Sequence, residues 1–150
     1  MNNTLYYEDV VIGEEYTSPG RTVTEADHTM FNMLSGDWNP IHADAEYARG
    51  SPFGQRLVAG VFGLALTMGA FNRWGIFEES ALALLNLREW NFKAPIFIND
   101  TIYVTMQFTG KRLASDDKRG LVQRKVRLLN QRDEVVQEGY TDMLIMLRPL

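Results

Sequence analysis

Residues 58–72 read Val-Ala-Gly-Val-Phe-Gly-Leu-Ala-Leu-Thr-Met-Gly-Ala-Phe-Asn, a run without a single charged side chain. Drawn as a helix, this stretch is apolar all round, which predicts a helix that is buried on every side. It also contains Gly60, Gly63 and Gly69, and each interior glycine costs about 1 kcal/mol of helix propensity relative to alanine. So many small residues indicate that other backbone packs very close, as a sheet wrapped around the helix would.

The residues after this helix have the pattern of β-strands. Ile102, Val104, Met106 and Phe108 alternate with residues 101, 103, 105, 107 and 109, which is typical of a half-buried strand. Further strands are expected at residues 15–23 (broken by Pro19-Gly20), 82–92, 121–129 and 135–147, with polar turns at 115–120 and 130–134. The order of elements predicts a single α+β domain over residues 1–150, in which a curved antiparallel sheet wraps around a long central helix.

A second helix is expected before the central one. Thr24 is a good N-cap and Asp27 three residues later completes a partial capping box, while Ser35-Gly36 ends the helix. Residues 44–49 have the pattern of a short capped helical turn.

Methionines and other apolar residues recur on one face of this second helix. They are Ala26, Met30, Met33 and Leu34. We expect Met30, Met33 and Met68 to belong to the core rather than to a ligand tunnel. His28 lies near the polar side of the same helix, and the sequence assigns it no function.

Residues 34–42, between the two helices, read Leu-Ser-Gly-Asp-Trp-Asn-Pro-Ile-His. Pro40 fixes its own φ and biases Asn39 away from helical backbone, which predicts a stiff, extended loop. The loop presents one carboxylate, Asp37, and one imidazole, His42, five positions apart. Such a pair can hold a water molecule between its two groups, and acid–base chemistry at neutral pH needs that arrangement.

Composition narrows the remaining possibilities. The net charge of −4 argues weakly against nucleic acid as a partner, and the absence of cysteine excludes disulfides and thiolate chemistry. With only two histidines, a histidine-rich metal site is not expected. The N-terminus has no signal-peptide pattern, and the longest apolar run, Leu57–Phe71, is shorter than the roughly 20 residues that span a bilayer. We therefore expect a soluble, cytoplasmic protein.

Residues 31–48, Phe-Asn-Met-Leu-Ser-Gly-Asp-Trp-Asn-Pro-Ile-His-Ala-Asp-Ala-Glu-Tyr-Ala, resemble the signature of the MaoC-like, R-specific enoyl-CoA hydratases. That signature is an aromatic residue, then Ser-Gly-Asp-x-Asn-Pro-x-His, then a small residue six positions past the histidine. The glycine-bearing helix, the segment Phe92-Lys93-Ala94-Pro95 and the strand meander are also similar to the family's layout. The resemblance implies a hot-dog fold, usually dimeric, and a lyase that needs no cofactor.

The resemblance also implies an activity and a set of site residues. Such an enzyme hydrates 2-enoyl thioesters of CoA or acyl carrier protein, or dehydrates the (R)-3-hydroxyacyl forms. Asp37 and His42 would take a proton from water and return one to C2, and the N–H of Gly60 would meet the thioester oxygen, as a helix N-terminus can. Asn39 would orient Asp37 or the loop backbone, or form a turn before Pro40.

Two residues depart from the family pattern, and other readings stay open. Ala59 stands where the family often has histidine, and Ala65 where some members carry a serine, which bears on substrate positioning. The alternatives are a hot-dog thioesterase, which the Asp-x-Asn-Pro-x-His loop disfavours, and an acyl-CoA-binding subunit without catalysis.

Basic residues either pair with CoA phosphates or, as we favour, keep the sheet surface solvated; they are Lys111, Arg112, Lys118, Arg119, Arg124, Lys125 and Arg127.

Overall fold

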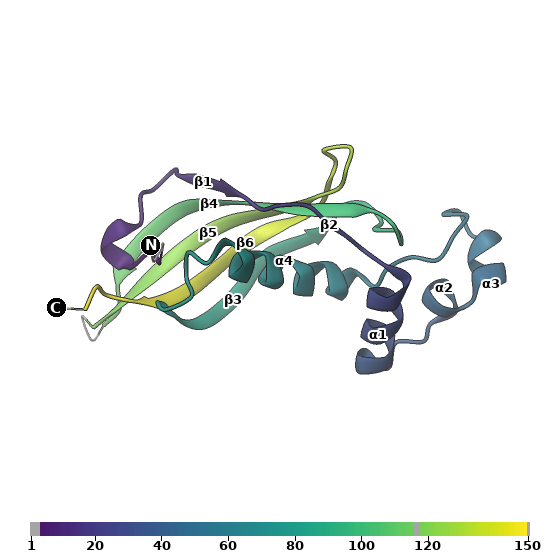
Figure 1. The fold of residues 1–150 in the computed structure, drawn as a ribbon, viewed down its shortest axis with the longest axis horizontal. Helices are drawn as coiled ribbons and strands as arrows, with labels where there is room; N and C mark the ends of the chain where they lie inside the picture. Colours follow the sequence, from purple (N-terminus) through teal and green to yellow (C-terminus); the bar gives the residue numbers. More distant parts are fainter. Residues whose placement is uncertain (1–3, 116–117, 150) are drawn as a thin grey trace.

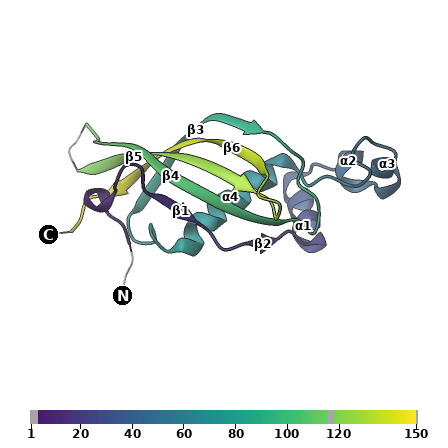
Figure 2. The ribbon, with the colours of Figure 1, turned by 90° about the horizontal axis from the view of Figure 1, so that it is seen from above.

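One curved antiparallel sheet packs against one long helix in the computed structural model, which describes residues 4–115 and 118–149. The helix, α4 (Gly60–Trp74), lies along the concave face of the sheet (Figure 1). Three shorter helices extend beyond one end of the sheet, in both views of Figures 1 and 2: α1 (Glu25–Ser35), α2 (Pro40–Ala43) and α3 (Ala45–Arg49). A 3₁₀ turn, η1, spans Tyr7–Asp9.

All pairings in the sheet are antiparallel, in the order β1-β4-β5-β6-β3, with β2 pairing to β4 beside β1. The strands are β1 (Glu15–Thr17), β2 (Arg21–Thr22), β3 (Ala81–Phe92), β4 (Thr101–Leu113), β5 (Arg119–Leu129) and β6 (Val135–Met146). The predicted meander is formed by β4, β5 and β6, while β3 pairs with β6 and is the far edge. This arrangement confirms the predicted α+β, hot-dog fold.

The core lies between the sheet and α4. The alternation predicted in β4 is confirmed, because Ile102, Val104, Met106 and Phe108 are at most 3% exposed. Burial of a large apolar side chain contributes about 1.5–3 kcal/mol, so these positions fix which face of the sheet meets the helix. The predicted turn at 115–120 lies partly outside the described residues.

Helix α4 is buried on one side rather than all round, so that part of the prediction is wrong. Val61 is 60% exposed in the single chain, and Ala65 and Gly69 continue the exposed stripe. Close packing occurs at two of the glycines, but side chains and not the predicted backbone make the approach, and Gly69 meets nothing within 4 Å. A Cβ on Gly60 would lie 2.9 Å from the Phe92 ring, and one on Gly63 would clash with the side chain of Gln137.

The predicted cap of α1 is confirmed. The Asp27 N–H donates to Thr24 Oγ1 (3.1 Å), and the Thr24 N–H donates to Asp27 Oδ2 (3.0 Å). Gly36 ends the helix with a φ of 73°, a conformation that glycine adopts without strain.

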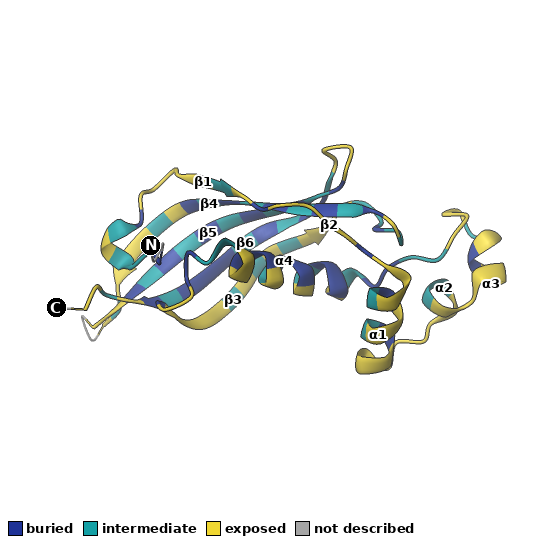
Figure 3. Ribbon diagram, viewed as in Figure 1, coloured by how far each residue is buried: buried dark blue, intermediate teal, exposed yellow. Residues whose placement is uncertain are grey.

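The side of α1 that faces the protein is not the predicted one. Met30, Met33 and Leu34 are 68%, 67% and 86% exposed, whereas His28 and Asn32 are buried. Figure 3 shows that most residues of α1, α2 and α3 are exposed or only partly buried. Because α1 lies at the end of the sheet, its apolar face has no sheet to pack on in a single chain. The expectation that Met30 and Met33 are core residues is therefore wrong.

No helix in the described part of the chain combines the length and the apolar character needed to cross a membrane.

Candidate active site

The segment that carries Asp37 and His42 is partly helical, so the prediction of an extended loop is only half right. Residues 37–39 are non-helical, but Pro40 starts helix α2, which includes His42. Asn39 is the N-cap, and its Oδ1 accepts a hydrogen bond from the Ile41 N–H (3.2 Å). Proline is well suited to the first helical position, because its fixed φ matches the helix and no N–H is needed there. The Asn39 side chain thus supports the backbone, as the turn alternative predicted.

Asp37 and His42 lie together, with Asp37 Oδ2 3.5 Å from His42 Nε2. The other ring nitrogen of His42 donates to the backbone oxygen of Leu57 (2.8 Å), so in the neutral ring Nδ1 carries the proton and Nε2 is free to accept one. The His42 side chain is 14% exposed and that of Asp37 is 48% exposed. The Asn39 N–H donates to Asp37 Oδ1 (3.3 Å), which turns Oδ2 towards the imidazole.

His42 and Gly60 line the same cavity, which has a volume of about 340 Å³. Its other walls are mainly apolar and include Leu57, Phe92 and Ile96. Gly60 is the first residue of α4, and within the described residues its N–H has no hydrogen-bond acceptor. The first N–H groups of a helix lack partners inside the helix and carry its positive end, so this amide can bind an oxygen that becomes negative.

Gln137 also lines this cavity, and the sequence analysis did not identify it. The side chain is 1% exposed; its Nε2 donates to the Gly60 carbonyl (2.8 Å) and its Oε1 accepts from Trp90 Nε1 (3.1 Å). The sequence gives no clear signal for it, because Glu138, Thr141 and Asp142 are further polar residues in the same strand.

His28 is the second residue that the sequence analysis missed. It is 2% exposed, and its Nε2 donates to the backbone carbonyl of His42 (2.8 Å). Asn32, one turn further along α1 and also buried, has its Nδ2 3.2 Å from the same nitrogen. The signal was a pair of polar residues spaced i, i+4, which share one face of a helix. Through this hydrogen bond, the buried His28 side chain holds the backbone of His42 in position.

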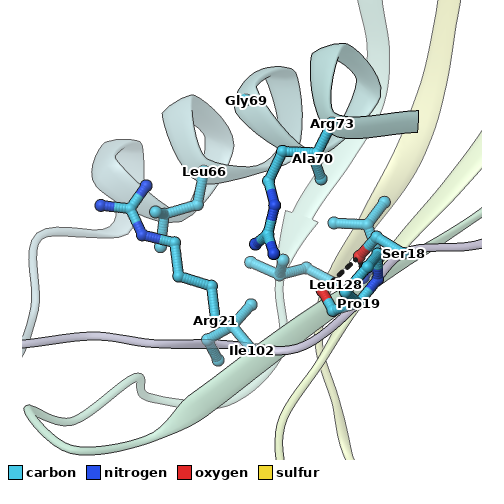
Figure 4. Close-up of a pocket in the computed structure, with 10 residues that line it drawn as sticks. Ser18, Pro19, Arg21, Leu66, Gly69, Ala70, Arg73, Ile102 and Leu128 are labelled. Carbon is cyan, nitrogen blue, oxygen red and sulfur yellow. Dashed lines mark hydrogen bonds between the residues drawn. The ribbon is translucent and has the colours of Figure 1, made fainter. Parts of the chain in front are cut away.

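Another cavity, of about 200 Å³, lies between α4 and the start of β4 (Figure 4). Its lining includes Arg21 and Arg73 but no carboxylate or imidazole, so it lacks the groups for acid–base chemistry. Among the described residues, no three His, Cys, Asp or Glu side chains are placed to hold a metal ion.

The predicted basic residues do not form one solvated surface. Arg124 is 2% exposed, because β5 is a central strand and this side chain faces the helix, so the surface interpretation is wrong for it. Arg127, on the other face, is 3.6 Å from Glu138. Pairing of the remaining basic residues with CoA phosphates stays a prediction.

A family model described as "MaoC like domain" matches residues 9–129, which include the whole dyad segment and most of the sheet. The chain belongs to the MaoC-like domain family. The match covers well over half of the sequence, and it agrees with the resemblance carried by residues 31–48.

Individual relatives agree with the MaoC-like assignment. The chain is similar to protein MaoC of Klebsiella aerogenes, with 35% identity over 101 residues, which are 67% of this chain and 30% of that protein. It thus spans under a third of that relative's length. It is also similar to an (R)-specific enoyl-CoA hydratase of Rhodospirillum rubrum, with 30% identity over 105 residues. This aligned region is 70% of each chain.

Solved structures show the same MaoC-like architecture. The monoamine oxidase regulatory protein from Archaeoglobus fulgius superimposes with a TM-score of 0.89 at 32% identity, over 97% of both chains. The MaoC-like dehydratase from Rhodospirillum rubrum gives a TM-score of 0.83 at 27% identity, over 97% of this chain and 99% of that one.

Proposed function

We propose that this MaoC-like protein adds water across the C2=C3 bond of a 2-enoyl-CoA, and removes it in the reverse direction. Membership of the MaoC-like family supports enoyl-CoA hydration as the general type of reaction. Relatives named as an (R)-specific enoyl-CoA hydratase and a 3-hydroxybutyryl-CoA dehydratase support a hydro-lyase. The particular residues, the substrate and the R configuration of the product are our inference for this chain.

The geometry of Asp37 and His42 carries the proposal. A water within hydrogen-bond distance of both Asp37 Oδ2 and His42 Nε2 would lie beside the pair, since these atoms are only 3.5 Å apart. As the water oxygen attacks C3, its proton passes to the pair, and a proton from the pair is added to C2. The two groups act as one unit, so we assign the two proton transfers to the pair jointly.

Gly60 supplies the third requirement of the reaction. During attack at C3, negative charge develops on the thioester oxygen, and a fixed donor aimed at that oxygen stabilises the transition state more than the substrate. Gly60 lines the cavity that His42 also lines, and its N–H has no acceptor among the residues that the structure describes. The hydrogen bond from Gln137 to the Gly60 carbonyl holds this peptide in place. This combination favours hydration over the alternative of a subunit that only binds acyl-CoA.

The test is product analysis after the wild-type protein is incubated with crotonyl-CoA. We expect loss of the absorbance of the conjugated thioester and formation of 3-hydroxybutyryl-CoA, with chiral analysis giving the R enantiomer. Release of free CoA, measured with a thiol reagent, would instead identify a thioesterase. Tight binding of an acyl-CoA without turnover would identify a binding subunit, and either result would overturn the proposal.

We also propose that the protein is a homodimer, because the edge strand β3 exposes apolar side chains. Leu82, Leu84, Leu85 and Leu87 are 40–49% exposed on this unpaired edge. Natural proteins protect such edges, and a second copy of the chain would do so. Light scattering should give twice the 17.1 kDa of one chain, and a mass of one chain would contradict the proposal.

A further inference from the structure

Arg124 is a buried cation at some distance from the candidate active site. It lies on the helix-facing side of β5 and is 2% exposed. Its guanidinium carbon is 4.5 Å from the centre of the Phe71 ring and 5.7 Å from that of Phe77, and its Nε donates to Thr141 Oγ1 (2.9 Å). Burial lowers the pKa of Arg124 to about 10, which leaves the side chain positively charged at neutral pH.

Across residues 4–115 and 118–149, no carboxylate forms an ion pair with Arg124. The nearby carboxylate of Asp142 is already engaged by Arg88 (2.8 Å) and Asn86 (3.1 Å). Burial acts to raise the pKa of Asp142, but these hydrogen bonds hold it below its usual value. In the described chain, the two terminal nitrogens of Arg124 donate no hydrogen bond. Buried charges in proteins are normally paired, so a guanidinium left open in this way indicates an anion that is supplied from outside the chain.

The open side of Arg124 faces a cavity of about 390 Å³. The wall is largely apolar, with Met68, Phe71, Leu84 and Met143 among its residues. Glu78 also lies on the wall but forms no ion pair with Arg124 in the described structure. One planar cation on an apolar wall suits a carboxylate at the end of a hydrocarbon chain, because guanidinium binds carboxylate through two parallel hydrogen bonds.

This cavity and the candidate active site lie along the same elements. Gly60, Leu64, Met68 and Phe71 are spaced i, i+4, i+8 and i+11 on α4, which places them on one side of the helix. At 1.5 Å per residue, Gly60 and Phe71 are about 16 Å apart along the axis. On β6, Gln137 contacts Gly60 and Thr141 contacts Arg124, which corresponds to about 13 Å of strand. The distance of about 13–16 Å between the two ends of these elements matches the length of a medium-chain acyl group.

We propose that Arg124 binds a carboxylate at the far end of the substrate's acyl chain, so that the preferred substrate is a medium-chain 2-enoyl thioester with a terminal carboxylate. This inference rests on the proposed function, because it deepens the choice of substrate at the same site. The carboxylate would complete the guanidinium, while Met68, Leu64 and Phe71 would line the path of the chain.

The test compares two 2-enoyl-CoAs of equal length, about ten carbons, one ending in a methyl group and the other in a carboxylate. We expect kcat/KM of the wild-type protein to be at least tenfold higher for the carboxylate-ended substrate. In Arg124→Met that preference should disappear. Both substrates are measured in the same sample, so a loss of folded protein cancels in the ratio. Arg127→Met is the matched control, because Arg127 lies on the same strand, on the solvent-facing side, and should keep the preference.

A binding measurement separates this inference from the proposed function. The saturated acyl-CoAs of the same pair cannot be hydrated, and calorimetry gives their Kd without turnover. We expect at least tenfold tighter binding of the carboxylate-ended form, lost in Arg124→Met and kept in Arg127→Met. Equal affinities of the wild-type protein for the two forms would overturn the role of Arg124, even if crotonyl-CoA is hydrated. Failure to hydrate either ten-carbon 2-enoyl-CoA, with the affinity difference intact, would overturn the reaction instead.

Discussion

His28 offers a sharp test of how the candidate site is positioned. Its Nε2 donates to the backbone carbonyl of His42 from a buried position. His28→Leu leaves that carbonyl without a donor, and an unsatisfied buried acceptor costs about 1–3 kcal/mol. For a domain of 150 residues this corresponds to a fall in Tm of roughly 2 to 12 °C. A displacement of the His42 imidazole by about 1 Å would lower kcat by up to about 100-fold.

The assay measures kcat and KM for crotonyl-CoA together with Tm. Because His28 lies behind His42 and outside the cavity, kcat should fall in His28→Leu while KM changes little. His28→Gln is the matched variant, since its side-chain N–H₂ can donate where Nε2 did, and it should recover most of the loss. Wild-type kcat and Tm in His28→Leu would refute the reasoning, as would equal damage in both variants.

Three further changes probe α1 and α4. Burial acts to raise the pKa of Asp27, but hydrogen bonds with Thr24 hold it below the usual 3.8. The stability this gives is present above pH 4 and is lost as the pH falls through the lowered pKa. Asp27→Asn should therefore cost about 1 kcal/mol at pH 7, with the Tm difference shrinking in acid; a difference independent of pH would contradict this. Gly63→Ala places a Cβ against Gln137 and should lower the free energy of unfolding by about 1–3 kcal/mol, which a thermal melt shows as a lower Tm. The hydration activity should fall as well. In Gly69→Ala the new Cβ meets no atom within 4 Å, so the free energy of unfolding should rise by up to about 1 kcal/mol. A lower Tm for Gly69→Ala than for Gly63→Ala would refute the packing account.

Local rules predicted much of the fold. The capping pair Thr24 and Asp27 and the alternation in β4 depend on neighbours in the sequence, and both occur as predicted. The glycine-bearing helix α4 also forms, but it is buried on one side instead of all round. The separation of Asp37 and His42 across one turn also brought their side chains together, as expected. Whether these two residues catalyse the reaction stays a prediction.

The errors arise where tertiary context reverses a local pattern. Periodicity locates an apolar face but does not say what it packs on. It predicts Met30 and Met33 as core residues, whereas both are exposed and Phe31 of the same helix packs against the core. The restriction that Pro40 places on Asn39 predicts an extended loop, but the first helical position accepts proline and α2 starts there. Arg124 lies among charged neighbours in the sequence, which favours the surface interpretation. Its place two residues from Val122 and Val126 puts it on the buried face of β5 instead.

The central claim is that Asp37 and His42 act together on one water. Asp37→Asn tests it most directly, because asparagine keeps the shape of the side chain and can still accept the Asn39 N–H but cannot take a proton. The account predicts a loss of about 10²- to 10⁴-fold in kcat/KM for crotonyl-CoA, with the Tm of the wild-type protein, and a similar loss in His42→Ala. Wild-type hydration activity in a folded Asp37→Asn variant would contradict it.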